Sequence, residues 1–214
     1  MHLYMKRFFA QKIKFNKLII FIFCVCILSG TIIPSENIPP KNHSSWNILQ
    51  EGDIWVGWTQ YENSQWCKAR GIINAPIENI SKLIENKVNY PNVFKRVESA
   101  TPITEYIIHI VLDMPFPFYG RDYIVSYSQL TEDGELIYRF KAVKNSGIPV
   151  HEDYVRLINA EGEWRLLSLD EDNTEVTYSW NGELLGDFPH WALPQAWETQ
   201  GVEVLNWLKD ALNE

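Results

Sequence analysis

The sequence predicts an α+β domain in which antiparallel strands precede and follow one central helix, and a long helix closes the chain. Three observations lead to this fold class. Strand-like runs recur before position 74 and after position 104, amphipathic helical spacing occupies the stretch between them, and a second helical stripe fills residues 194–212. Because the strands come in runs and the helices lie apart from them, a layered antiparallel sheet is favoured over a parallel one.

Composition sets the first limits on function. The 214 residues are 46% hydrophobic and 14% aromatic, which suits one well-cored domain and leaves little room for a second. All 27 acidic residues lie after position 33, together with 14 of the 19 basic ones, so this part of the chain has a formal charge of −13. Such a body is a poor partner for nucleic acid and has no broad attraction to anionic membranes.

The first 33 residues have a different character. Five basic residues are followed by a mostly apolar run over residues 18–33. As a helix this run would extend about 24 Å, short of the roughly 30 Å hydrocarbon core of a bilayer. We therefore expect residues 1–33 to be an export signal, with an uncleaved membrane anchor through residues 18–33 as the alternative. Either interpretation predicts an exported protein, periplasmic or extracellular.

Residues 34–45 contain three prolines and predict a linker, so the folded domain is expected to cover residues 46–214. Cys67 is the one cysteine beyond the N-terminal segment, which excludes an intrachain disulfide in that domain. The five histidines lack metal-ligand spacing, and the sequence has no nucleophile elbow, phosphate loop or dinucleotide fingerprint. We therefore expect no metal, no cofactor and no catalytic group.

The elements of the first half begin with a short helix. Two serines precede Trp46, and serine is a good N-cap residue, so a capped helix is expected over residues 44–49. Strand-like runs at residues 54–58 and 66–73 predict a hairpin. Pro76 then favours a helix start, and apolar residues at helical spacing continue the helix to residue 89.

Strands dominate the second half, and residues 131–134 (Thr-Glu-Asp-Gly) give a hairpin turn signal. The closing helix is expected over residues 194–212 because its apolar positions repeat at three and four. The expected strands cover residues 104–112, 121–130, 136–143, 154–158, 162–167 and 175–180, and the apolar stripe of the helix consists of Trp197, Gly201, Val204, Leu205, Leu208 and Leu212.

The most informative stretch covers residues 114–127, Met-Pro-Phe-Pro-Phe-Tyr-Gly-Arg-Asp-Tyr-Ile-Val-Ser-Tyr, in which a proline-bounded turn places a charged pair at the start of an apolar strand. Further along come Tyr154-Val-Arg156, Trp164, the segment 186–191 (Gly-Asp-Phe-Pro-His-Trp) and the closing helix. In order and spacing these features resemble START (StAR-related lipid-transfer) domains of the helix-grip, Bet v 1-like superfamily. The resemblance extends over residues 46–214.

The resemblance implies a helix-grip fold, in which a curved antiparallel sheet wraps around the C-terminal helix and an apolar cavity lies between them. It implies a monomeric, non-enzymatic carrier that binds a lipid or another hydrophobic small molecule and transfers it through transient membrane contact. The acidic charge of the domain separately predicts that it binds no nucleic acid. Two alternatives stay open. One is an aromatase/cyclase-like enzyme of the same superfamily, and the other is an interaction module with a filled interior.

The resemblance also points to Arg121 as a buried cation at the inner end of the cavity, where it must be paired or must meet a polar head group. The alternative is a surface or turn-anchoring pair. Family members often carry an acidic partner on the preceding strand, where this chain has Ile108, flanked by His109, with Asp113 and Glu105 further away. If Arg121 faces inward without a partner, an anionic head group is favoured over a bare sterol.

Other residues have two interpretations each. Arg156 is either an outward-facing strand residue or a second polar anchor, and Trp191 and Trp197 are either gate residues or core residues. The complete set of expected ligand-binding residues is Arg121, Asp122, Tyr123, Arg156, Trp191, Trp197 and Leu205.

Overall fold

The computed structural model describes residues 37–144, 146–186 and 188–213. The predicted export signal or membrane anchor therefore lies outside the described residues. From Asn37 onward the chain forms one compact unit. Within the described ranges, no helix combines the length and the apolar character that a membrane crossing requires.

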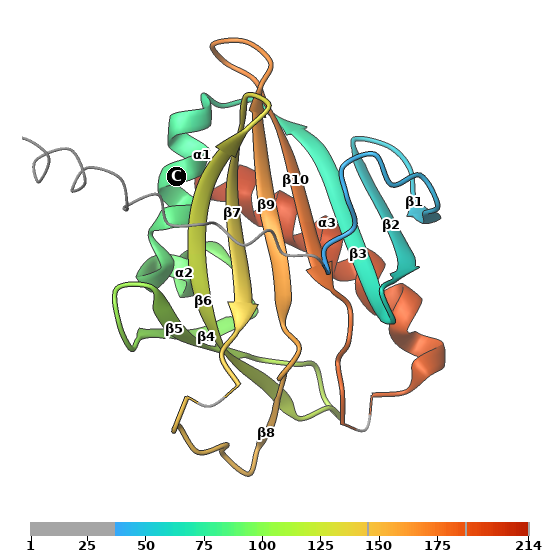
Figure 1. Cartoon of the computed structure of the whole chain (residues 1–214), viewed down its shortest axis with the longest axis vertical. Coiled ribbons are helices and arrows are strands. Elements are labelled where there is room, and N and C mark those ends of the chain that lie inside the picture. Colours follow the sequence, from blue (N-terminus) through green and yellow to red (C-terminus); the bar gives the residue numbers. More distant parts are fainter. Residues whose placement is uncertain (1–36, 145, 187, 214) are drawn as a thin grey trace, which may run out of the picture. The chain divides into compact units, whose positions relative to one another are not determined.

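The described strands form one curved, ten-stranded sheet in the order β1-β2-β3-β10-β9-β7-β6-β5-β4, with β8 beside β6 (Figure 1). Neighbours along this path pair in antiparallel fashion, which confirms the predicted fold class. The strands are β1 (Asn47–Gln50), β2 (Ile54–Tyr61), β3 (Ser64–Ile73), β4 (Val97–Pro102), β5 (Ile107–Leu112), β6 (Gly120–Glu132), β7 (Glu135–Ala142), β8 (Tyr154–Arg156), β9 (Glu161–Ser168) and β10 (Thr174–Asn181).

The helices gather on one side of the sheet, where α3 lies across its concave face (Figure 1). They are α1 (Ile77–Glu85), the 3-10 turn η1 (Lys87–Asn89), α2 (Tyr90–Val93), the 3-10 turn η2 (His190–Ala192) and α3 (Leu193–Ala211). The expected helix over residues 74–89 is thus real but shorter. It ends at Glu85, and the apolar residues beyond it belong to η1 and α2.

The closing helix packs as its stripe predicts. Trp197, Val204, Leu205 and Leu208 are buried, and the helix contacts β2 and β3. Close approach requires a glycine at position 201, because a Cβ there would lie 3.0 Å from side-chain carbons of Val56 and 3.1 Å from Cβ of Ala69. The middle of α3 therefore packs closely against the sheet.

Three expectations about strands need correction. Residues 47–50 form an edge strand on β2 instead of a helix, because pairing with β2 satisfies the backbone while Trp46 packs edge-on against Trp55. The strand β4 was not expected. It is an edge strand with few apolar residues, and it ends at Pro102, which suits an edge. The strand at Tyr154 has three residues and pairs with β6 in parallel.

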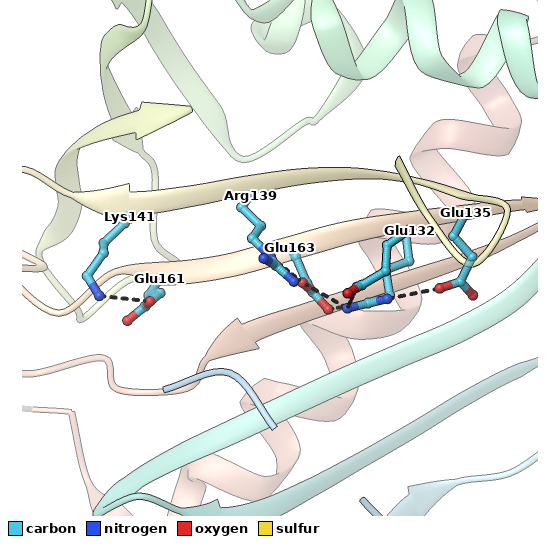
Figure 2. A network of polar contacts seen from close by, with 7 residues as sticks. Glu132, Glu135, Arg139, Lys141, Glu161 and Glu163 are labelled. Carbon is cyan, nitrogen blue, oxygen red and sulfur yellow. Dashed lines mark hydrogen bonds and ion pairs between the residues drawn. The ribbon is translucent and has the colours of Figure 1, made fainter. Parts of the chain in front are cut away.

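The convex face of the sheet carries ionic residues, which we call the outer-face network (Figure 2). Arg139 lies opposite Glu163, and Lys141 lies opposite Glu161, on the neighbouring strands β7 and β9. These pairs are 2.9 and 3.0 Å apart. Arg165 completes the network by contacting Glu132, Glu135 and Glu163.

Residues 37–45, the described part of the predicted linker, cover this convex face, and we call them the N-terminal cover. Asn37 and Lys41 contact two carboxylates of the network, Lys41 at 2.8 Å from Glu135. The Nε2 atom of His43 lies 3.0 Å from the hydroxyl of Thr59. Ile38 and Pro39 are buried. The cover explains why carboxylates on an outward-facing strand surface are themselves buried.

Candidate ligand-binding cavity

A cavity of about 360 Å³ lies between α3 and the concave face of the sheet. Its floor is aromatic. The ring centroids of Trp164 and Tyr178 are 4.2 Å apart, and those of Tyr178 and Trp180 are 4.9 Å apart, both in stacked geometry. The floor consists of Tyr90, Phe94, Tyr123, Tyr127, Phe140, Trp164, Tyr178 and Trp180. The stacked rings of the floor form a rigid apolar surface that keeps its arrangement without a bound ligand.

The polar groups of the floor are the phenol hydroxyls of its tyrosines and the indole nitrogens of Trp164 and Trp180. Burial raises the pKa of Tyr90, Tyr123, Tyr127 and Tyr178 above the usual value for tyrosine, so they are neutral at physiological pH. The hydroxyl of Tyr90 donates to the carbonyl of Ile84 at 2.7 Å. Across the described ranges, no protein partner is present for the hydroxyls of Tyr123 and Tyr178.

The charged groups stand at the rim, in the segments before β4 and after β5 and β10, and on α3. Arg96, just before β4, forms a two-pronged ion pair with Glu203 of α3, with N–O distances of 2.6 and 2.8 Å. The hydrogen bond to Glu203, with a smaller contribution from Asp113, raises the pKa of Arg96. The pair ties α3 to the segment before β4 beside the cavity, which both residues line.

Solved structures with this arrangement identify the fold. A STAR-related lipid transfer protein from Xanthomonas axonopodis gives a TM-score of 0.69 over 80% of this chain and 100% of that chain, at 21% identity. Human StAR-related lipid transfer protein 5 gives 0.70 over 81% of this chain and 88% of that chain, at 16% identity. The chain has the START fold. At these identities the likeness is one of fold.

Sequence comparisons add little to this START-like domain. No protein-family model matches the chain. An uncharacterised protein of Pseudomonas aeruginosa is 36% identical over 81 residues, a match that spans 37% of this chain and 40% of that protein.

Arg121 is fully buried, as the START resemblance implies, and its described hydrogen bonds go to backbone carbonyls. Its Nε donates to Leu184 at 2.7 Å and its Nη2 to Leu185 at 3.1 Å, while Nη1 donates to Tyr119. Arg121 is absent from the described lining of the cavity. The guanidinium instead fastens the segment between β10 and α3 to the start of β6, which matches the turn-anchoring interpretation better than the ligand-binding one.

Asp122 points to the opposite face of β6, since side chains alternate along a strand. Arg156 donates to both carboxylate oxygens, at 2.8 and 2.6 Å, and Nε2 of His109 lies 2.8 Å from Oδ2. Burial alone would raise the pKa of Asp122, but the hydrogen bonds from Arg156 and His109 outweigh it and lower the pKa. Asp122, Arg156 and His109 therefore lock β8 and β5 to β6.

Of the other expected residues, Tyr123 lines the cavity floor. Trp197 is buried, donates from its indole nitrogen to the carbonyl of Gly182 at 2.7 Å and packs on Trp58, as its core interpretation predicts. Leu205 is a core residue on the same helix. Trp191 is 83% exposed. Tyr123 is thus the one expected binding residue that the described cavity includes.

The sequence reasoning missed most of the floor. Tyr127 stands four positions after Tyr123 on β6, and Tyr178 and Trp180 stand two apart on β10, so each pair shares one face of its strand. Aromatic residues at alternating positions on the predicted strands were the signal that could have found them. The Arg96–Glu203 contact carried no local signal, because its two residues are 107 positions apart.

Proposed function

We propose that this START-fold domain binds one lipid or similar hydrophobic molecule in the cavity and carries it without chemical change. The observation that supports the proposal is the cavity itself, an aromatic-walled space beneath α3 with charges confined to its rim. Its volume lies at the lower end of the usual range for small-molecule sites. Burying ten methylene groups there would supply about 8 kcal/mol at ~0.8 kcal/mol each, before the costs of association.

Loading and release require an opening, and the loops at one end of the cavity suit transient membrane contact. Phe118, after β5, and Phe188, before α3, both line the cavity with their ring centroids 4.6 Å apart. Beside them Phe116 is 97% exposed and Trp191 is 83% exposed. Exposed aromatic residues are favoured at membrane interfaces. In this proposal they enter the bilayer surface, the two loops separate, and the ligand passes between them.

The competing functions fit the cavity less well. A cyclase needs an acid or base beside its substrate, whereas the floor offers phenols whose pKa burial has raised, and these are poor bases at neutral pH. A pure interaction module with a filled interior leaves a space of about 360 Å³ unexplained.

The test is native mass spectrometry of the full chain purified from cells, followed by organic extraction and by a vesicle-to-vesicle transfer assay. We expect one bound lipid per chain. Ala196→Phe, which places a ring in the cavity from α3, should abolish binding and transfer together. The double variant Phe116→Ser, Trp191→Ser should retain the ligand and slow transfer about tenfold or more, since two buried aromatic side chains contribute several kcal/mol to membrane contact.

The matched control is Asn206→Phe, which adds the same ring at an exposed position of the same helix. It should bind and transfer as the unaltered protein does. A chain that carries no lipid from cells and takes up none from vesicles would contradict the proposed function. Equal transfer by the double variant and the unaltered protein would contradict the membrane step alone.

A further inference from the structure

The charges around the cavity are strongly unequal in sign. Three of the described lining residues, Asp113, Glu183 and Glu203, carry carboxylates, and Arg96 carries the one guanidinium. Glu161 also lines the cavity, but its carboxylate belongs to the outer-face network on the convex face. A ligand in this cavity would therefore meet mostly negative charge wherever it meets charge at all.

The guanidinium of Arg96 already forms an ion pair within the protein. It binds both oxygens of Glu203 and lies within the field of Asp113. A ligand carboxylate or phosphate would have to displace Glu203, at the cost of leaving that carboxylate without its partner. Arg121, which the sequence suggested as an anion anchor, is absent from the described lining, and its guanidinium donates to the backbone carbonyls of Tyr119, Leu184 and Leu185.

The carboxylates differ in how far they are neutralised. Glu161 is engaged by Lys141 on the convex face, at 3.0 Å (Figure 2), and Glu203 by Arg96. Glu183 accepts a hydrogen bond from the amide of Asn159 at 2.9 Å, which brings no positive charge. Asp113 is exposed at the opening. Two carboxylates thus leave the rim net negative.

The floor offers hydrogen bonds without charge. Tyr123 and Tyr178 line it with hydroxyls that have no protein partner within the described ranges. A phenol can donate to a ligand hydroxyl, carbonyl or ester oxygen, and it can accept from a hydroxyl. It cannot compensate a full negative charge in an apolar wall, where an unpaired ion costs several kcal/mol.

We infer that the cavity selects uncharged amphiphiles with a hydroxyl or carbonyl group and discriminates against fatty acids and other anionic lipids. This inference rests on the proposed carrier function and names its ligand class. The sequence favoured an anionic head group only if Arg121 faced inward without a partner, and Arg121 instead donates hydrogen bonds to backbone carbonyls of the protein.

The experiment compares three ligands that share one chain, namely myristyl alcohol, methyl myristate and myristate, by native mass spectrometry and tryptophan fluorescence of the full chain at neutral pH. We expect the alcohol and the ester to bind at least about tenfold more tightly than the ionised acid. Tyr123→Phe combined with Tyr178→Phe should weaken alcohol binding several-fold and leave binding of the hydrocarbon tetradecane unchanged.

Charge variants separate this explanation from simple hydrophobicity. Asp113→Asn combined with Glu183→Gln removes two negative charges at the rim. The ratio of the affinities for myristyl alcohol and myristate should fall several-fold, because myristate binds more tightly while the affinity for the alcohol is unchanged. Myristate binding as tightly as the alcohol to the unaltered protein would overturn the inference while supporting a carrier. Failure of the alcohol, the ester, the acid and tetradecane to bind would overturn the carrier function, and the inference with it.

Discussion

The two faces of the sheet are both covered, but by opposite chemistry. The concave face meets α3 through aromatic side chains and encloses a cavity. The convex face lies under the N-terminal cover and carries carboxylates paired with guanidinium and ammonium groups (Figure 2). One of these carboxylates, that of Glu163, belongs to a side chain that is 3% exposed. A buried charge is costly unless it is paired at hydrogen-bond distance, so the convex face has to be closely packed with specific contacts. Aromatic side chains need no such partners, so the concave face can enclose a cavity.

The two faces therefore have different roles, since the convex face stabilises the sheet and the concave face binds the ligand. Cross-strand ion pairs on the convex face join β7 to β9 at defined register positions and involve no floor residue. The concave face can then exchange its contents while the strands stay in place. Variants on the two faces should accordingly affect different measurements.

The largest expected effect comes from Glu163→Leu. The change leaves Arg139 without its ion-pair partner and removes one of the carboxylates around Arg165, so we expect a loss of about 3 kcal/mol in the free energy of unfolding. Urea denaturation measures it. Ligand affinity of the folded fraction should stay within about twofold, because Glu163 lies on the face away from the cavity.

The double variant Glu163→Leu, Arg139→Met is the control, since it removes the stranded charge together with its partner. It should recover a large part of the lost stability. A ligand affinity that falls in parallel with stability in both variants would contradict the division between the faces.

A smaller effect is expected from Asp122→Asn, near the start of β6 where β8 pairs with it. The lowered pKa of Asp122 means that its ionised form stabilises the fold at pH values above the unfolded-state pKa of about 4, and that this contribution is lost as the pH falls through the lower folded-state pKa. We expect the variant to be about 2 kcal/mol less stable at pH 7. Its stability should also fall less steeply than that of the unaltered protein between pH 5 and pH 3.

Urea denaturation across that pH range checks the prediction. Glu98→Gln is a useful control, because Glu98 accepts a hydrogen bond from Tyr154 at an exposed site near the same strand and should leave the acid profile nearly unchanged. Parallel acid profiles of Asp122→Asn and the unaltered protein would show that Arg156 and His109 do not stabilise the ionised carboxylate.

Periodicity predicted those parts of the fold in which local pattern and tertiary packing agree. The stripe from Trp197 to Leu208 became the buried face of α3, and the strand starting at Arg121 was found with its hairpin partner. The pattern failed at β1 and β4, which lie at the two edges of the sheet and depend on one neighbour each. An edge strand needs little hydrophobic signal of its own.

The site was harder to predict because it depends on how the inner face is filled. Arg121 and Trp197 are both buried, and both lie in segments that resemble START domains. Each nevertheless donates to a backbone carbonyl of the protein and not toward a ligand. No sequence pattern distinguishes an arginine that anchors a loop from one that binds a ligand. Likewise Asn37 and Lys41 follow a proline-rich stretch typical of a linker, and only the carboxylates of distant strands explain why they dock.

The smallest effect on stability is expected from Arg96→Gln, at the side of the cavity where Arg96 contacts α3. Arg96 and Glu203 are 36% and 28% exposed, so their ion pair should contribute no more than about 1 kcal/mol to the free energy of unfolding. Its effect on ligand exchange should be larger, because the pair joins α3 to the segment before β4 beside the cavity and must break whenever α3 moves away from the sheet. We expect ligand dissociation to accelerate about two- to fivefold with little change in melting temperature.

Lys95→Gln is the matched control, since Lys95 reaches the same helix at Asp210 through a longer contact of 3.8 Å between exposed side chains. Equal dissociation rates in the two variants would mean that the ligand leaves by a route that does not require α3 to separate from Arg96.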